Sequence, residues 1–193
     1  MLLLERAWQA TARHLATLFL MIAVVTVPLH VVYGFLFQDT IAVRALHTSI
    51  ERLPPGTSVQ GVNDDDIVTA RRVHLALGLV ELALLPLFVG ATRRVLEVGE
   101  SEGDLPAIAD ALRHSPSRIR PLGPVPVAPF VAAVLFAALV TILAQWIGRT
   151  LAEPLSNEVA FVGRAVAEGA ARALGAPWLL TVWALGMAPA ENA

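Results

Sequence analysis

Three long apolar stretches constrain this chain more than any other feature of its sequence. They cover residues 15–37, 73–96 and 129–148. A helix needs about 20 predominantly apolar residues to cross a hydrocarbon core about 30 Å thick. The sequence therefore predicts three transmembrane helices.

The composition agrees with lipid as the surrounding medium. Hydrophobic residues make up 56% of the 193 residues and charged residues only 16%, whereas soluble domains carry about 25% charged residues. The net charge of −2 and the lack of a basic stripe argue against a nucleic-acid-binding protein. We predict an all-α, polytopic transmembrane helical bundle in which residues 1–193 form a single integral membrane domain.

The C-terminal part allows two arrangements. Residues 156–174 read as an amphipathic helix, and residues 176–188 are apolar but too short to span a bilayer alone. Three charged residues follow each other at i,i+4 in the first part: Arg164, Glu168 and Arg172. Either one helix continues through Pro177 as a strained fourth span, or an interfacial helix precedes a short segment that dips into the membrane. We favour an amphipathic helix that leads into a fourth hydrophobic segment.

Short helices are expected at the membrane interface. Residues 2–14 mix apolar and charged side chains, with Trp8 at the level of the lipid headgroups. Further short helices are predicted over residues 40–52 and 104–114. Three acids at 64–66 favour the positive end of a helix that runs directly into the second span.

Two ionisable residues fall inside the apolar stretches, where each needs a partner. His30 lies seven residues before Phe37, or about 10 Å below that end of the first span. Glu81 lies eight residues after Val73, about 12 Å below the same end of the second. The two side chains are thus expected at nearly the same depth. Gln145, near the end of the third span, is a possible third polar group.

Three interpretations of this intramembrane polar pair remain open. His30 and Glu81 can hydrogen-bond across two helices and fix their register, because polar pairs often hold membrane helices together. They can also form a proton- or ligand-handling site that faces a cavity. In a third packing they never meet.

A helix-packing face is predicted in the C-terminal helix. Small residues recur every four positions: Gly163, Ala167, Ala171 and Gly175. Small side chains at this spacing let helices approach closely in lipid.

The sequence offers few routes to catalysis or to a cofactor. Lys and Cys are absent, which excludes Schiff-base lysines, disulfides and thiolate metal sites. No metalloprotease, nucleophile-elbow or phosphate-loop motif occurs. We therefore expect no enzyme activity, no metal site and no cofactor. Haem or pigment ligation by His14, His30 or His74 is a further alternative. The three histidines are expected at different depths in the membrane, which makes it difficult for two of them to bind the same haem or pigment ring.

The positions of the arginines and the amino-acid usage suggest in which membrane the chain lies and how it is oriented. The use of Arg in place of Lys, with abundant Ala, is typical of a GC-rich bacterial genome. Arginine clusters on the two sides of the spans nearly balance, and the pairs Arg93/Arg94 and Arg118/Arg120 favour a cytoplasmic N-terminus. We predict a multi-pass protein of the bacterial plasma membrane.

Part of the chain resembles a known group of proteins. The letters LLPLFVGATRRVLE at residues 84–97 are followed by IADALRHSPSRIRPL at 108–122, and the N-terminus carries Ala7, Trp8, Arg13 and His14. This pattern resembles the membrane domain of glycerophosphodiester phosphodiesterase-like and related multi-pass bacterial membrane proteins. The resemblance implies no catalytic residues here, because the phosphodiesterase chemistry of that family belongs to a separate soluble domain.

These observations favour a non-catalytic accessory or scaffold subunit of a larger membrane complex, with other membrane subunits as partners. One alternative is a small transporter or permease component that uses His30 and Glu81. A second alternative is a haem- or pigment-associated membrane subunit.

Overall fold

The chain folds into helices throughout the part that the structure describes. The computed structural model describes residues 2–36, 64–101, 108–114, 127–152 and 157–186, and these ranges contain no strand. The helices are α1 (Leu2–Leu36), α3 (Asp64–Ser101), α4 (Ile108–His114), α5 (Val127–Ala152) and α6 (Asn157–Gly186). The prediction of an all-α chain is confirmed.

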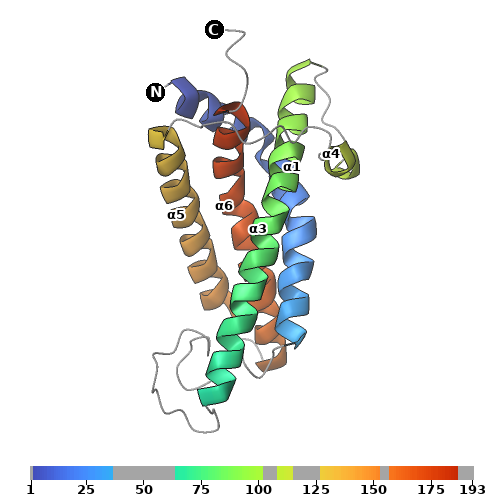
Figure 1. Ribbon diagram of the computed structural model, residues 1–193, viewed down its shortest axis with the longest axis vertical. Helices are drawn as coiled ribbons and strands as arrows, with labels where there is room; N and C mark the ends of the chain where they lie inside the picture. The colour runs from blue at the N-terminus through green and yellow to red at the C-terminus, as the bar shows by residue number, and fades with distance from the viewer. Residues whose placement is uncertain (1, 37–63, 102–107, 115–126, 153–156, 187–193) are drawn as a thin grey trace.

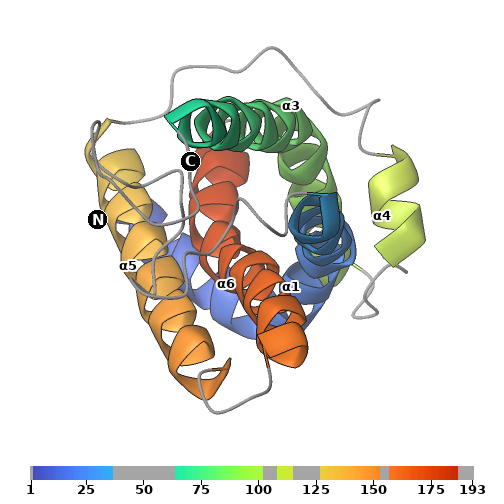
Figure 2. The same ribbon diagram turned by 90° about the horizontal axis from the view of Figure 1, so that it is seen from below.

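Helix α6 lies at the centre of the bundle. It packs between α1 and α5, and α3 crosses over it from the lower end of the bundle to the upper end (Figures 1 and 2). Helices α1 and α5 run downward in Figure 1, whereas α3 and α6 run upward. The first and last described residues, Leu2 and Gly186, therefore lie at the same end of the bundle.

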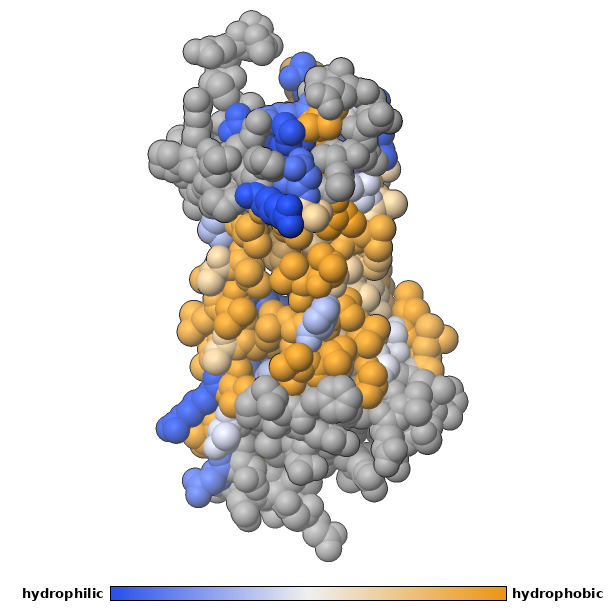
Figure 3. Space-filling model, turned by 90° about the vertical axis from the view of Figure 1, so that its right-hand side faces the viewer, coloured by the Kyte–Doolittle hydropathy of each residue, from blue (hydrophilic) through white to orange (hydrophobic). Residues whose placement is uncertain are grey.

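An apolar belt surrounds the middle of the bundle. Figure 3 shows it as an orange band between more hydrophilic ends. Three segments are long and apolar enough to cross a membrane: Leu2–Gly34, Ile67–Gly99 and Val127–Gly148. Large apolar side chains point outward from them, such as Leu75 (67% exposed) and Leu135 (66% exposed). Exposure of this extent marks a surface that contacts lipid rather than water, so three helices of spanning length are confirmed and indicate a membrane protein.

Helix α1 is kinked close to its N-terminus. His14 has non-helical angles of φ −111° and ψ 15°, and the segment before it crosses the upper end of the bundle behind α6 (Figure 1). This segment buries Ala7 in a cluster with Ala133 of α5 and Val182 of α6. The interfacial helix predicted over residues 2–14 is therefore packed on the bundle and is continuous with the first span, because its apolar side has helices to cover.

Helix α6 joins the two C-terminal segments that the sequence separated. It runs without a break from Asn157 to Gly186, with Pro177 inside it. The amphipathic helix expected over 156–174 thus leads into the apolar segment expected over 176–188 as one helix within the described residues 157–186. Pro177 is buried, and neighbouring helices allow a membrane helix to continue through proline although one backbone hydrogen bond is lost.

The other predicted boundaries are close to the observed ones. The spans expected over 15–37, 73–96 and 129–148 fall within α1, α3 and α5 apart from Phe37, which lies outside the described residues. As expected, α3 begins at the acids and runs directly into the second span. The helix predicted over 104–114 is described from Ile108, and the one predicted over 40–52 lies outside the described residues.

Candidate functional site: a charged centre between three helices

The structure brings His30 and Glu81 together. His30 Nε2 lies 3.3 Å from Glu81 Oε1, across the contact between α1 and α3. His30 lies about 10 Å from one end of its apolar stretch and Glu81 about 12 Å from the same end of its own, so that the side chains meet inside the apolar belt. Of the three interpretations, the packing in which they never meet disagrees with this geometry.

Arg172 of α6 completes the centre. Its Nε lies 3.0 Å from Glu81 Oε1, and its Nη1 lies 2.5 Å from His30 Nε2. One guanidinium group thus bridges the carboxylate and the imidazole, because its N–H groups point in several directions within one plane. We call His30, Glu81 and Arg172 the charged centre.

The hydrogen bonds of His30 define the tautomer that the geometry favours. Its Nδ1 lies 2.8 Å from the carbonyl oxygen of Thr26, one turn earlier in α1. Because that oxygen can only accept, Nδ1–H is the donor, and in a neutral ring Nε2 is left as an acceptor. Nε2 can then accept from Arg172 Nη1–H. A second proton on the ring would turn Nε2 into a donor that faces Glu81 and repels Arg172.

The charged centre is shielded unevenly from its surroundings. The His30 side chain is 1% exposed, whereas those of Glu81 and Arg172 are 24% and 26% exposed. Among the described residues, none gives Glu81 Oε1 a hydrogen bond of good geometry, so its nearby cations stabilise it mainly by charge. Glu168, one turn before Arg172, also acts electrostatically on His30. The centre is thus an ion pair at the edge of the bundle with a buried imidazole behind it.

A close contact between α1 and α6 positions the charged centre. Thr26 Oγ1 lies 3.1 Å from the carbonyl oxygens of both Ile22 and Gly169 and donates to them. A Cβ atom built on Gly169 would lie 2.7 Å from Val27 Cα. Only glycine therefore lets the two backbones approach this closely, and this contact lies one turn from both His30 and Arg172.

The predicted helix-packing face of α6 is occupied within the chain. A Cβ on Gly175 would collide with Thr141 and with the Ala137 carbonyl oxygen of α5, and one on Gly148 would meet Ala167. Ala171 lies between these contacts on the same face and is 2% exposed, and Gly163 is half-buried. At Ala167 and Gly175 this face therefore packs α6 against α5.

Gln145 does not join the charged centre. It lies on α5, which packs mainly against α6 and contacts α1 at its N-terminal segment (Figure 2). The sequence placed it on the same side of the membrane as His30 and Glu81 but shallower, and could not show that α6 lies between α5 and these two residues.

His14, His30 and His74 do not form a common ligand set. Both ring nitrogens of His30 are engaged by Thr26, Arg172 and Glu81. The other two lie elsewhere: the His14 ring packs over Gly99 at the upper end of α3, and His74 lies beside Tyr33 with ring centroids 6.4 Å apart. In the described part of the chain, no group of three or more His, Cys, Asp or Glu side chains could hold a metal ion.

Sequence reasoning missed the role of Arg172, although it recorded the charged stripe. A membrane-spanning α6 would have revealed it. Arg172 lies 14 residues before Gly186, or about 21 Å along the helix, so that a spanning α6 would hold it inside the membrane. The stripe of Arg164, Glu168 and Arg172 was assigned to an interfacial helix because three charged side chains in one stretch are unfavourable in lipid. Pairing with residues of other helices removes this cost.

No protein-family model, curated protein or solved structure matches this chain.

Proposed function

We propose that this chain is a non-catalytic, polytopic subunit of a larger membrane complex. The observation that carries the proposal is the uncovered outer face of α5, the outermost long helix. Only 6% of the most apolar 18-residue stretch within Val127–Gly148 is buried. On that face Ala138 is exposed among larger side chains, including Leu135 and Ile142. A small residue between large ones suits interlocking contact with another transmembrane helix, which in lipid depends on packing.

We propose further that α6 is the fourth membrane crossing. Its 30 residues correspond to about 45 Å, and it lies antiparallel to α5 inside the bundle (Figure 1). Its charged residue at mid-depth, Arg172, is paired with Glu81, which removes the main objection to a transmembrane position. The resemblance to membrane domains of glycerophosphodiester phosphodiesterase-like proteins supports the same non-catalytic role.

A pairing of Arg172 inside the membrane also favours a cytoplasmic N-terminus. When Arg172 is left out, seven arginines fall on the same side of the membrane as the N-terminus and six on the opposite side, judged by their positions relative to the spans. The side of the N-terminus holds Arg6, Arg13, Arg93, Arg94, Arg113, Arg118 and Arg120. Excess arginine marks the cytoplasmic side, and we place the chain in a bacterial plasma membrane with its N-terminus inside.

A steric change on α5 tests the subunit role. We expect Ala138→Trp to reduce recovery of a stoichiometric partner at least several-fold when the chain is extracted in native lipid discs, because lipid adapts to an indole whereas a packed helix does not. Val24→Trp, at an exposed site of α1 (56% exposed), is the matched control. If the wild-type chain is extracted without any partner, the subunit proposal fails.

A second candidate function is proton or cation handling at the charged centre. The imidazole of His30, the carboxylate of Glu81 and the guanidinium of Arg172 lie within 3.3 Å of one another. A proton can therefore pass between the imidazole and the carboxylate, and Glu81 is open enough at 24% exposure to exchange it.

Flux measurements test this second candidate. In vesicles that contain the purified chain, Glu81→Gln should remove proton or cation flux while its melting temperature stays close to that of the wild type. Arg164→Gln, two turns before Arg172 on the same stripe, is the control and should retain flux. Vesicles of the wild-type chain with no flux above empty vesicles would reject this function.

A further inference from the structure

An apolar groove opens at the upper end of the bundle, away from the charged centre. It has a volume of about 400 Å³ and lies between the N-terminal segment of α1, α5 and α6. This volume falls in the range of small-molecule sites. Among the described residues that line the groove, Glu5 alone carries a charge, so the groove combines an apolar interior with one acidic rim.

Three aromatic rings form one wall of the groove. The ring centroid of Trp8 lies 5.2 Å from that of Phe136 and 4.4 Å from that of Trp178, and those of Phe136 and Trp178 lie 5.0 Å apart. Rings this close touch one another and leave no space between them for a cation. They therefore form a continuous apolar wall and not an aromatic cage, which suits an alkyl chain.

Small residues of α5 also line the groove, one turn from Phe136. Ala132 is exposed and Ala133 is buried, and their methyl groups leave the space that larger side chains would fill. At the upper end of α5, above the face proposed for a partner, the outward positions Val127 and Val131 are 76% and 47% exposed. There the groove is continuous with an apolar surface, so an acyl chain can enter it from the bilayer.

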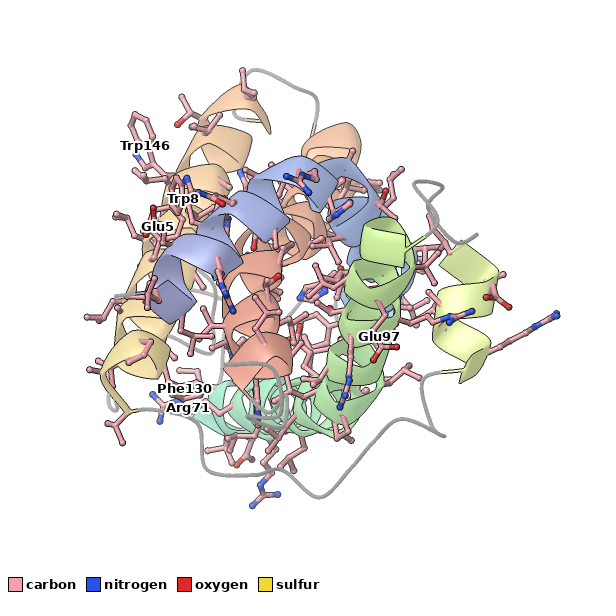
Figure 4. The ribbon with its side chains drawn as sticks, turned by 90° about the horizontal axis from the view of Figure 1, so that it is seen from above. Glu5, Trp8, Arg71, Glu97, Phe130 and Trp146 are labelled. Atoms are coloured by element: carbon pink, nitrogen blue, oxygen red, sulfur yellow. The ribbon has the colours of Figure 1, made fainter. Side chains whose placement is uncertain are left out.

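The residues at the edge of the groove, Glu5 and Trp8, indicate which lipid head group fits there. Glu5 and Trp8 lie on the side of the N-terminal segment nearest to α5 (Figure 4). Tryptophan near the end of a span is typical of the headgroup level, and a carboxylate there attracts an ammonium group. We propose that the groove holds one acyl chain of a membrane aminophospholipid, with its ammonium group beside Glu5. This site is independent of any protein partner.

Tryptophan quenching by brominated lipids tests this site, with the full chain in nanodiscs. Trp146 and Trp183 are first replaced by Phe so that the signal comes from Trp8 and Trp178. At equal mole fraction, phosphatidylethanolamine with brominated chains should occupy the groove about two- to fivefold more than brominated phosphatidylglycerol, since exposed ion pairs contribute modestly.

Two variants and a control separate the chain contact from the head-group contact. Ala132→Phe should remove the saturable quenching, because its ring fills the groove, whereas Ala138→Phe on the outer face of α5 should leave it unchanged. Glu5→Gln should remove the preference between the lipids and retain quenching. Quenching that rises linearly with brominated lipid and ignores Ala132→Phe would overturn the site, and an unchanged lipid preference in Glu5→Gln would overturn its head-group assignment.

Discussion

Replacing Arg172 by Leu is expected to lower the free energy of unfolding by about 2–4 kcal/mol, because removal of one partner leaves a poorly solvated charge behind. Glu81 is three-quarters shielded at 24% exposure and would lose the cation 3.0 Å from its Oε1. His30 Nε2 would lose its donor in the same step. The measurement is unfolding by SDS titration in mixed micelles.

The double variant Glu81→Leu/Arg172→Leu tests whether the lost stability comes from the carboxylate left without its cation. Replacement of a whole buried ion pair by apolar side chains is often neutral or stabilising, so we expect stability within about 1 kcal/mol of the wild type. Arg164→Leu, on the same stripe of α6, is the control and should change stability little. If Arg172→Leu is as stable as the wild type, Arg172 does not offset the cost of the shielded Glu81 carboxylate.

The second large effect is expected at the contact between α1 and α6. A Cβ on Gly169 would lie 2.7 Å from Val27 Cα and 2.9 Å from the Thr26 carbonyl oxygen. Both are backbone atoms, so Gly169→Ala must separate the helices, and we expect a loss of about 1–3 kcal/mol. The thermal midpoint in detergent should fall accordingly.

The same substitution elsewhere in the chain gives a matched control. Gly78 of α3 has no atom within 4 Å of its added Cβ among the atoms considered, so Gly78→Ala should be neutral or stabilising by up to about 1 kcal/mol through helix propensity. The two alanines should therefore act in opposite directions. Equal effects of the two would show that α1 and α6 do not approach closely at Gly169.

The sequence predicted the apolar helices well because lipid imposes a simple rule. A helix in hydrocarbon must be apolar over about 20 residues, and that pattern is visible without any knowledge of neighbours. The same geometry explains the placement of His30 and Glu81, since helix rise alone gives their depths. Gln145 was considered as a third member of this polar group, but it does not join it. Depth along a helix does not tell on which side of a neighbouring helix a residue lies.

Helix α6 was harder to predict because its stability depends on partners. Arg172 is unfavourable in lipid when considered alone, yet Glu81 and His30 lie within 3.0 Å and 2.5 Å of its guanidinium nitrogens. Likewise Pro177 interrupts one hydrogen bond, but it is buried in a helix that packs against both α1 and α5. Such compensation arises only after the helices assemble, so local sequence patterns do not reveal it.

The most direct test of the central claim, that α6 carries Arg172 across the membrane, is cysteine labelling at its two ends. The chain has no native cysteine, so Val162→Cys and Gly186→Cys each introduce a single thiol. Asp65→Cys and Ala109→Cys mark the lower and upper ends of the bundle, and a membrane-impermeant maleimide is applied to intact cells and to inverted vesicles. We predict that Val162→Cys labels from the same side as Asp65→Cys, and Gly186→Cys from the side of Ala109→Cys. Labelling of both ends of α6 from one side would contradict the account.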